Sequence, residues 1–271
     1  MTYSYDSTVT RPPMFQEFRE LWLYRDLLSL LIVNGIKTRY KRSAMGVVWT
    51  LLNPLLNTAV LTIAFSQLMR FEVKSYPIYL LTGLICWNFF AQTTLQAANT
   101  LVWGSGLLKR IYLPRTIFAI SVLGNGLVNF GLALIPLFII MLIYRHPISV
   151  TFLLLPVPVL FAAMFTLGVA LWVSTFAIFF TDVVDLYNII LQAWFFLTPI
   201  VYPLTILHPR GAAILRFNPV YLIVDQFRRL LYDGQWPSWH SLLITAGMSL
   251  FILASGWWLF TKRVDDLAYR I

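Results

Sequence analysis

The stretch LQAWFFLTPIVYPL, residues 191–204, decides how this chain must fold. It is apolar enough for a lipid bilayer, yet Pro199 and Pro203 lie in its second half. A proline inside a helix removes a backbone hydrogen bond and clashes with the preceding turn, at a cost of about 3 kcal/mol. Lipid supplies no water to replace that bond. We therefore predict a helix through about Leu197, followed by a kinked or non-helical segment over 198–205 that faces protein or a watery cavity.

The rest of the chain has the composition of an integral membrane protein. Of its 271 residues, 59% are hydrophobic and 11% are charged, against roughly 25% charged in a typical soluble domain. Six runs without charged residues or histidine have about the 17–25 residues that a membrane-spanning helix needs. The predicted spans are 45–69, 76–98, 116–144, 149–180, 186–205 and 241–261. The fold class is therefore all-α, with an N-terminal segment over 1–44 and a six-helix transmembrane domain over 45–271.

The positive net charge indicates a membrane topology. Lys and Arg concentrate on the cytoplasmic side of membrane proteins. If the N-terminus is inside, thirteen of the 20 Lys and Arg residues fall in cytoplasmic segments. We predict that both termini are cytoplasmic, and we expect membrane lipids and no nucleic acid as partners.

Residues 14–44 are predicted to form an amphipathic helix in the cytoplasmic interface. Its first apolar positions recur at helical spacing: Phe15, Phe18, Leu21 and Trp22. A bend is expected at Asn34-Gly35. The basic residues Arg39, Lys41 and Arg42 follow. They either anchor the topology against anionic lipid or contact the anionic headgroup of a substrate that enters from the inner leaflet.

The second cytoplasmic connection, residues 100–115, is short and basic. Lys109 follows Gly104 at the spacing of a phosphate-binding loop, but Leu108 and Arg110 replace the second Gly and the Ser/Thr of that motif. We therefore predict no nucleotide site. A compact cytoplasmic helix that ends near Pro114 and docks a partner is the favoured interpretation.

The long outer connection, within 198–238, contains one further predicted helix. Asn218 and Pro219 resemble an N-cap and a first helical residue, and Gly234 resembles a stop. The apolar positions form one stripe: Ile223, Phe227, Leu230 and Leu231. The charged residues are expected on other faces: Asp225, Arg228 and Arg229. The prediction is a short interfacial helix on the outer surface.

Neutral polar residues recur at helical spacing inside the charge-free runs. They form three sets: Asn53 and Asn57; Asn88, Gln92 and Gln96; and Ser121, Asn125 and Asn129. The absence of ionisable groups from these runs disfavours a proton-coupled transporter. The amides serve either as hydrogen bonds between helices or as the lining of a path for a neutral, hydroxyl-rich substrate.

Two tryptophans, Trp87 and Trp194, fall near the middle of predicted spans, away from the interfaces where Trp is usually enriched. Phe90, Phe195 and Phe196 accompany them. They either pack the protein interior or offer faces against which sugar rings stack, by extension of aromatic contact energetics.

The pair Asp182 and Asp185 follows the fourth predicted span. It either caps the start of the next helix, where negative charge is favourable, or imitates the metal-binding acidic pair of a glycosyltransferase. No other metal-ligand or catalytic arrangement is predicted.

Several stretches together resemble the permease subunits of polysaccharide and teichoic-acid ABC exporters of the type-2 export class. They occur in the family's order: LYRDLL and TRYKRSAMGVVWTLLNPLL, LLKRIYLPRTIFAIS, TDVVDLYNIILQAWFFLTPIVYP, and NPVYLIVDQFRRLLYDG. They cover the chain from about residue 20 to residue 235.

The resemblance implies a bacterial inner-membrane permease that acts as a homodimer with two separate ABC ATPase subunits. ATP and Mg would be bound by those partners, with no cofactor in this chain. The coupling residues implied are Lys109, Arg110, Pro114 and Arg115, and the residues of a re-entrant outer gate are Pro199, Tyr202, Pro203, Asn218 and Pro219. The expected substrate is a lipid-linked polysaccharide or polyol-phosphate polymer. The alternatives are a membrane glycosyltransferase or polymerase, and an exporter of drugs or small lipids.

Overall fold

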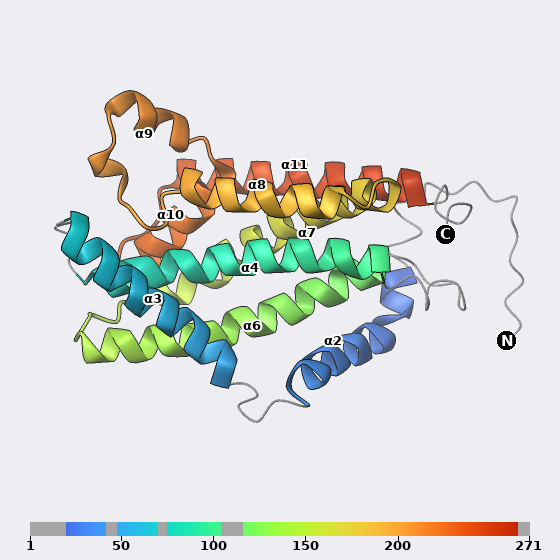
Figure 1. Ribbon diagram of the computed structural model, residues 1–271, viewed down its shortest axis with the longest axis horizontal. Helices are drawn as coiled ribbons and strands as arrows, with labels where there is room; N and C mark the ends of the chain where they lie inside the picture. Colours follow the sequence, from blue (N-terminus) through green and yellow to red (C-terminus); the bar gives the residue numbers. More distant parts are fainter. Residues whose placement is uncertain (1–19, 42–47, 70–74, 104–115, 265–271) are drawn as a thin grey trace, which may run out of the picture.

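The computed structural model describes residues 20–41, 48–69, 75–103 and 116–264, and the regular elements in this part of the chain are all helices. Five of them run along the long axis of the molecule (Figure 1): α4 (Tyr76–Trp103), α6 (Thr116–Ile143), α7 (Pro156–Phe179), α8 (Val183–Leu197) and α11 (Trp239–Val264). Helix α3 (Val48–Met69) crosses them obliquely.

Four segments are long and apolar enough to cross a membrane: Tyr76–Val102, Thr116–Ile143, Val150–Phe179 and Trp239–Arg263. Two further apolar helices are shorter, Leu51–Phe65 and Val183–Leu197. They correspond to the first and fifth predicted spans. An all-helical membrane fold is thereby confirmed, and the count of six spans and the orientation of the termini stay predictions.

Short elements gather at one end of the bundle, at the left in Figure 1. These are η1 (Val150–Leu154), η2 (Leu204–Ile206), α9 (Pro209–Leu215) and α10 (Pro219–Leu231). Three begin with a side-chain cap, in which Ser149, His208 or Asn218 accepts a hydrogen bond from the backbone N–H two residues later. Gly234 has a positive φ of 63° and follows the end of α10, as the stop signal predicted.

Helix α2 (Arg25–Tyr40) packs against α6 through small residues. A Cβ added at Gly124 of α6 would lie 2.5 Å from Cδ1 of Ile32, and the amide of Asn125 lies directly against Gly35. The predicted bend at Asn34-Gly35 is wrong, because α2 continues through both residues. The glycine instead allows close contact between two helices. The residues expected to begin the amphipathic helix, Phe15 and Phe18, lie outside the described part of the chain.

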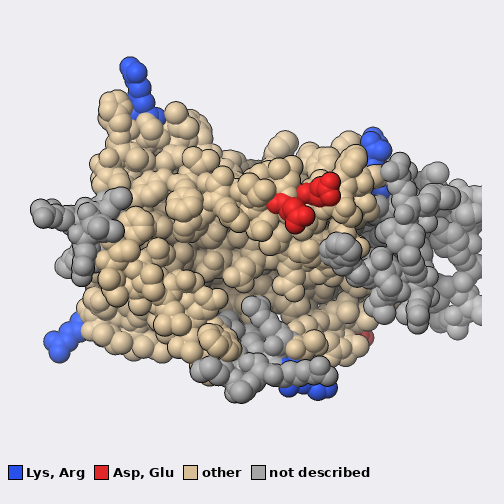
Figure 2. All heavy atoms as spheres, viewed as in Figure 1, with Lys and Arg blue, Asp and Glu red and all other residues tan. Residues whose placement is uncertain are grey.

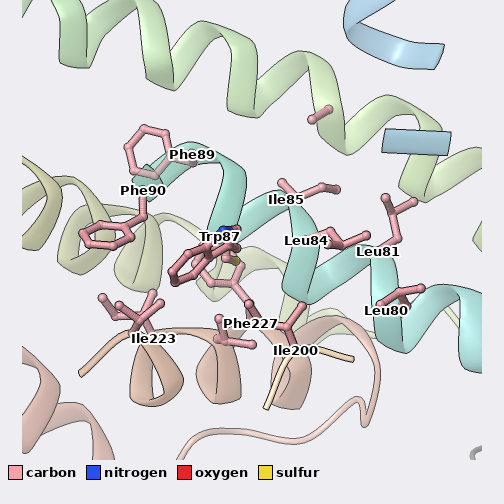
Figure 3. Close-up of a cluster of buried hydrophobic side chains, with 14 of the residues drawn as sticks. Leu80, Leu81, Leu84, Ile85, Trp87, Phe89, Phe90, Ile200, Ile223 and Phe227 are labelled. Carbon is pink, nitrogen blue, oxygen red and sulfur yellow. The ribbon is translucent and has the colours of Figure 1, made fainter. Parts of the chain in front are cut away.

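Helix α4 forms the centre of the bundle. Of its most apolar 18 residues 72% are buried, against 39% or less in the other three candidate spans. Figure 3 shows Trp87 of α4 near Phe227 and Ile223 of α10, with Ile200 beside them. Phe227 and Ile200 are almost fully buried. The outer connection thus contributes directly to the main hydrophobic core.

The position of α10 corrects the predicted outer surface helix. Val220, Val224 and Leu231 are buried, and so are Gln226 and Arg228. Gln226 donates to Thr245 of α11 at 2.7 Å. The predicted surface position was wrong, because α10 packs into the bundle and buries Arg228 together with most of its apolar residues.

The fifth predicted span ends where the proline argument placed its end. Helix α8 stops at Leu197, residues 198–203 are non-helical, and η2 then forms a single 3-10 turn. The span boundary of 186–205 was therefore too long at its C-terminal side and too short at the other, since α8 begins at Val183.

Helices α7 and α11 pack through glycines, and this is the most extensive helix pair of the structure. A Cβ at Gly168 would lie 2.5 Å from the carbonyl oxygen of Ile252, and one at Gly256 would meet the carbonyl oxygen of Gly168. Small residues allow backbones to approach closely where lipid gives helices little hydrophobic reason to associate.

Candidate functional site

A groove of about 380 Å³ lies between α4 and α8. Its lining residues are Trp87, Ala91, Gln92 and Leu95 of α4, with Asn188, Leu191, Gln192, Phe195 and Phe196 of α8. Three of them are amides, and all three amide residues are exposed. An amide offers both donors and an acceptor without a charge. The groove therefore combines apolar walls with neutral hydrogen-bonding groups.

Aromatic rings form a connected cluster at one end of this groove. The ring of Trp87 lies 5.7 Å from that of Phe90 and 5.6 Å from that of Phe195, centroid to centroid. Phe90 in turn contacts Trp194 at 5.3 Å, and Phe195 contacts Phe196 at 5.3 Å. Most of these pairs meet edge to face, a geometry that aromatic quadrupoles favour. Phe196 is 69% exposed and offers a free ring surface.

The structure separates the polar residues that the sequence placed on one path. Gln92 lies in the groove, whereas Gln96 is exposed on α4 beyond the lining and Asn88 is half-buried outside it. Asn125 lies against α2, and Asn129 is on the same helix as Asn125. Within one chain the α4 and α6 amides thus belong to different surfaces, and their common role in a substrate path stays a prediction.

Two polar groove residues were not among the predicted site residues. Asn188 and Gln192 lie four residues apart on α8 and face the groove together. Their spacing is the same signal that singled out the amides of the other helices.

The broken segment after α8 has a hydrogen-bond donor for each of four consecutive carbonyl oxygens. Arg228 donates to Pro199 at 2.5 Å and to Ile200 at 2.6 Å. The hydroxyl of Tyr76 donates to Val201 at 2.6 Å, and that of Tyr79 to Tyr202 at 3.2 Å. A non-helical backbone is tolerated at membrane depth where protein satisfies its polar groups. Side chains of α4 and α10 do so here.

Asn218 ties the end of α8 to the start of α10. Its Oδ1 accepts from the backbone N–H of Val220 at 3.1 Å and from Nε1 of Trp194 at 3.1 Å. Its Nδ2 donates to Thr198 Oγ1 at 2.9 Å and to the carbonyl oxygen of Leu197 at 3.3 Å. The predicted N-cap at Asn218 and first helical residue at Pro219 are confirmed.

The charged groups of the outer connection lie beside this segment. Nε of Arg229 donates a hydrogen bond to the carboxylate of Asp225 at 2.7 Å, and this ion pair raises the pKa of Arg229. Burial, followed by the nearby Asp225 carboxylate, raises the pKa of Asp233. His146 stacks on Tyr232 with ring centroids 5.7 Å apart. The ring contact joins the C-terminal end of α10 to the connection between α6 and α7.

The face of the molecule over α4 and α8 carries little charge (Figure 2). One acidic patch interrupts it, at the start of α8, and the basic residues lie near the edges of the view. Asp182 and Asp185 are both exposed there, and Asp182 makes no side-chain capping bond, so the expected cap is not formed by a hydrogen bond. Among the described residues no three His, Cys, Asp or Glu side chains gather to hold a metal ion.

Of the basic residues predicted to contact the substrate headgroup or the ATPase, only Arg39 and Lys41 belong to the described part of the chain. Lys41 is exposed and directly follows α2, and the backbone of Arg39 belongs to α2. Arg42 and the coupling residues Lys109, Arg110, Pro114 and Arg115 lie outside the described residues, so the roles assigned to them stay predictions.

Three known proteins with similar sequences are transport proteins for polysaccharides. The O-antigen export system permease protein RfbA of Myxococcus xanthus is 28% identical over 260 residues, which cover 95% of this chain and 100% of that protein. A protein of the same name from Klebsiella pneumoniae is 29% identical over 212 residues, 77% of this chain and 81% of its own length. The polysialic acid transport protein KpsM of Escherichia coli is 23% identical over 246 residues, 89% of this chain and 94% of KpsM.

The family described as ABC-2 type transporter matches residues 26–232, most of the chain. The family expected from the sequence is thereby confirmed: this protein is a membrane permease of the ABC-2 type transporter family.

Proposed function

We propose that this chain is the membrane-spanning subunit of an ATP-driven exporter that moves a lipid-linked polysaccharide from the cytoplasm across the bacterial inner membrane. The relatives named for O-antigen export and polysialic acid transport support this substrate class. The observation that carries the proposal is the groove, whose lining combines three exposed amides with the rings of Trp87, Phe195 and the exposed Phe196 and contains no charged group.

The chemistry of the groove suits a glycan. Sugar hydroxyls both donate and accept hydrogen bonds, as the amides of Gln92, Asn188 and Gln192 do. The less polar faces of pyranose rings pack on aromatic rings such as Phe196. Because none of the lining groups is charged, a long polymer can move along them without being held at one strong site. A teichoic-acid type polymer of polyol phosphate is the second candidate within this class.

The functional assembly that we propose contains two copies of this chain and two ATPase subunits. ATP and Mg would be bound by the ATPase, and no cofactor is assigned to this chain. The lipid headgroup would enter near Arg39, Lys41 and Arg42, and segment 100–115 would contact the ATPase. The residues after α8 would form the outer gate, including Pro199, Tyr202, Pro203, Asn218 and Pro219.

The proposal is tested with the purified permease–ATPase complex in liposomes. Lipid-linked glycan should raise the ATPase rate and should appear inside inverted vesicles only when ATP is present. No response to any lipid-linked glycan, with intact ATP turnover, would argue against the function. A response to free lipid or to drug-like amphiphiles alone would instead favour the alternative exporter class.

The groove is tested with the double variant Gln92→Leu/Gln192→Leu. Loss of two hydrogen bonds of about 1 kcal/mol each lowers binding roughly tenfold or more. The matched control is Gln96→Leu, an equally exposed amide of α4 outside the groove lining. Glycan transport should fall in the double variant and stay near wild type in the control. Equal glycan transport in the double variant and the control would show that the groove does not bind the substrate during transport.

The coupling segment is tested by replacing Lys109, Arg110 and Arg115 together with Ala. We expect the ATPase subunit to dissociate more readily or to lose its response to glycan, while the permease still folds. Unchanged coupled transport would show that these basic side chains do not carry the contact.

A further inference from the structure

Arg228 occupies an unusual environment for a charged side chain. It is 5% exposed, and its guanidinium lies over the ring of Tyr79, 3.6 Å from the ring centroid. The nearby carboxylate of Asp225 pairs with Arg229 instead. Burying a charge without a charged partner is costly unless hydrogen bonds compensate for it. Here the compensation comes from the carbonyl oxygens of Pro199 and Ile200.

The position of Arg228 relates the broken segment to the groove. Along α4, Tyr76 and Tyr79 bind the carbonyls of Val201 and Tyr202. Gly83 then lies against the guanidinium, and Trp87, one turn further, begins the groove. Segment 199–202 therefore lies on α4 immediately beyond the outer end of the groove. Figure 3 shows Ile200 in this place, between α4 and the buried side chains of α10.

Gly83 provides the space that this arrangement needs. A Cβ added there would lie 2.7 Å from Nη2 of Arg228 and 3.1 Å from Cγ2 of Ile200. A side chain at this position would displace the guanidinium or the segment. The contact thus depends on two residues from different helices: Arg228 of α10 supplies the guanidinium, and Gly83 of α4 leaves space for it.

We propose that Arg228 is a positioning residue, a latch that holds segment 199–202 against α10, beside α4, and thereby closes the outer end of the groove. This proposal rests on the proposed function, because it assigns to the latch a step in glycan release. The fork of an arginine can hold two carbonyl oxygens at once. If the segment moved away from α10, both carbonyl oxygens would need water as the replacement donor. Release of the segment would break the two bonds from Arg228 and replace them with bonds to water. The bonds from Arg228 would form again after the polymer has left.

The test measures access to the groove from outside. In a Cys86→Ala background, Ala91→Cys places a thiol in the groove lining. A membrane-impermeant maleimide is applied to the outer face of cells that contain the whole complex. The labelling rate follows the fraction of molecules whose outer end is open. Arg228→Met and Gly83→Ala should each label about ten- to a hundredfold faster, the effect of losing charge-assisted hydrogen bonds.

Two further variants separate the latch from a general loss of packing. Gly131→Ala adds the same methyl group where no atom lies within 4 Å, and it should label at the original rate. Arg228→Lys keeps the charge but loses the fork, and it should label at an intermediate rate. If Arg228→Met fails to fold, Gly83→Ala and Arg228→Lys decide the question. Unchanged labelling in these two folded variants would overturn the proposal.

The readout also separates this proposal from the proposed function. Labelling of the variants needs neither ATP nor glycan, so faster labelling would support the latch even if no glycan stimulated the complex. In the Ala91→Cys reporter protein with Arg228 intact, ATP and lipid-linked glycan together should raise the labelling rate. Export without any such rise would show that the segment stays closed during transport, and the latch would not be a step in it.

Discussion

Replacement of Asn218 by Ala should strongly destabilise the connection between α8 and α10. The side chain makes four hydrogen bonds, to Val220, Trp194, Thr198 and Leu197. It therefore joins the last turn of α8, the broken segment and the first turn of α10. Alanine removes all four bonds and leaves the indole N–H of the half-buried Trp194 without its acceptor.

The expected magnitude follows from those bonds. Loss of an N-cap costs about 1 kcal/mol, and a hydrogen bond between membrane helices is worth about 0.6 kcal/mol on average. One cap and three further bonds therefore sum to about 3 kcal/mol. For a chain of this size a change of 1 kcal/mol shifts Tm by roughly 2–4 °C, so we expect a decrease of about 6–12 °C.

The assay is thermal unfolding of the purified protein in nanodiscs, followed by tryptophan fluorescence. Asn218→Asp serves as a partial replacement, since it keeps the acceptor for Val220 and Trp194 but cannot donate, and about half of the loss is expected. Asn57→Ala is the control, because its 2.7 Å bond to Asn53 is exposed. If Asn218→Ala were no less stable than Asn57→Ala, the connecting role of this side chain would be refuted.

Two other predictions concern the helix packing and the acidic pair. Gly168→Ala should destabilise the protein by about 1–3 kcal/mol through overpacking, because the new methyl group would meet the carbonyl oxygen of Ile252; Gly131→Ala is the matched control, and equal melting temperatures would contradict the close α7–α11 contact. Asp182→Asn with Asp185→Asn should leave glycan synthesis unchanged in cells, because both carboxylates are exposed and no metal-binding group surrounds them among the described residues. Loss of polymer synthesis would favour the glycosyltransferase alternative.

The membrane helices were predictable because lipid imposes a simple rule on sequence. A lipid-facing helix must be long and free of charge, and the predicted span 116–144 matches α6 (Thr116–Ile143) to one residue. The end of α8 at Leu197 was predictable for a related reason. Two prolines four residues apart beyond the first turn remove two successive helical hydrogen bonds, and a helix rarely continues through both. Local chemistry decided both features.

The buried side of α10 shows where a local argument fails. Val224, Arg228 and Leu231 recur at the spacing of one helix face, and all three are buried. The pattern was present in the sequence, but the predicted apolar stripe of α10 placed Arg228 on another face and did not include Val224. Only the tertiary structure supplies the carbonyl oxygens that satisfy the guanidinium, and these come from a segment almost thirty residues earlier in the chain.

The amides illustrate a second limit. Spacing shows which residues share a face of one helix, but it does not show which neighbour that face meets. Gln92 turned toward α8 and Asn125 toward α2, although both belong to similar series. The relative rotation of packed helices depends on contacts such as Gly35 with Asn125, which no pattern within a single helix reveals.

The break at the two prolines is tolerated because the carbonyl oxygens that it affects have other hydrogen-bond donors. In a continuous helix, Pro199 and Pro203 would leave the carbonyl oxygens of Phe195 and Pro199 without donors. Each of these two carbonyl oxygens accepts a hydrogen bond from a different donor in the structure. The N–H of Thr198 donates to Phe195 at 3.2 Å, within the same turn, and Arg228 donates to Pro199 from α10. The first replacement is local and stays in place when the segment moves. The second belongs to a different helix, so it holds the closed arrangement only while α10 and the segment remain in contact. Under the proposed latch, the bond from Arg228 to Pro199 is therefore the one that is lost when the segment leaves α10, whereas the bond from Thr198 to Phe195 is kept.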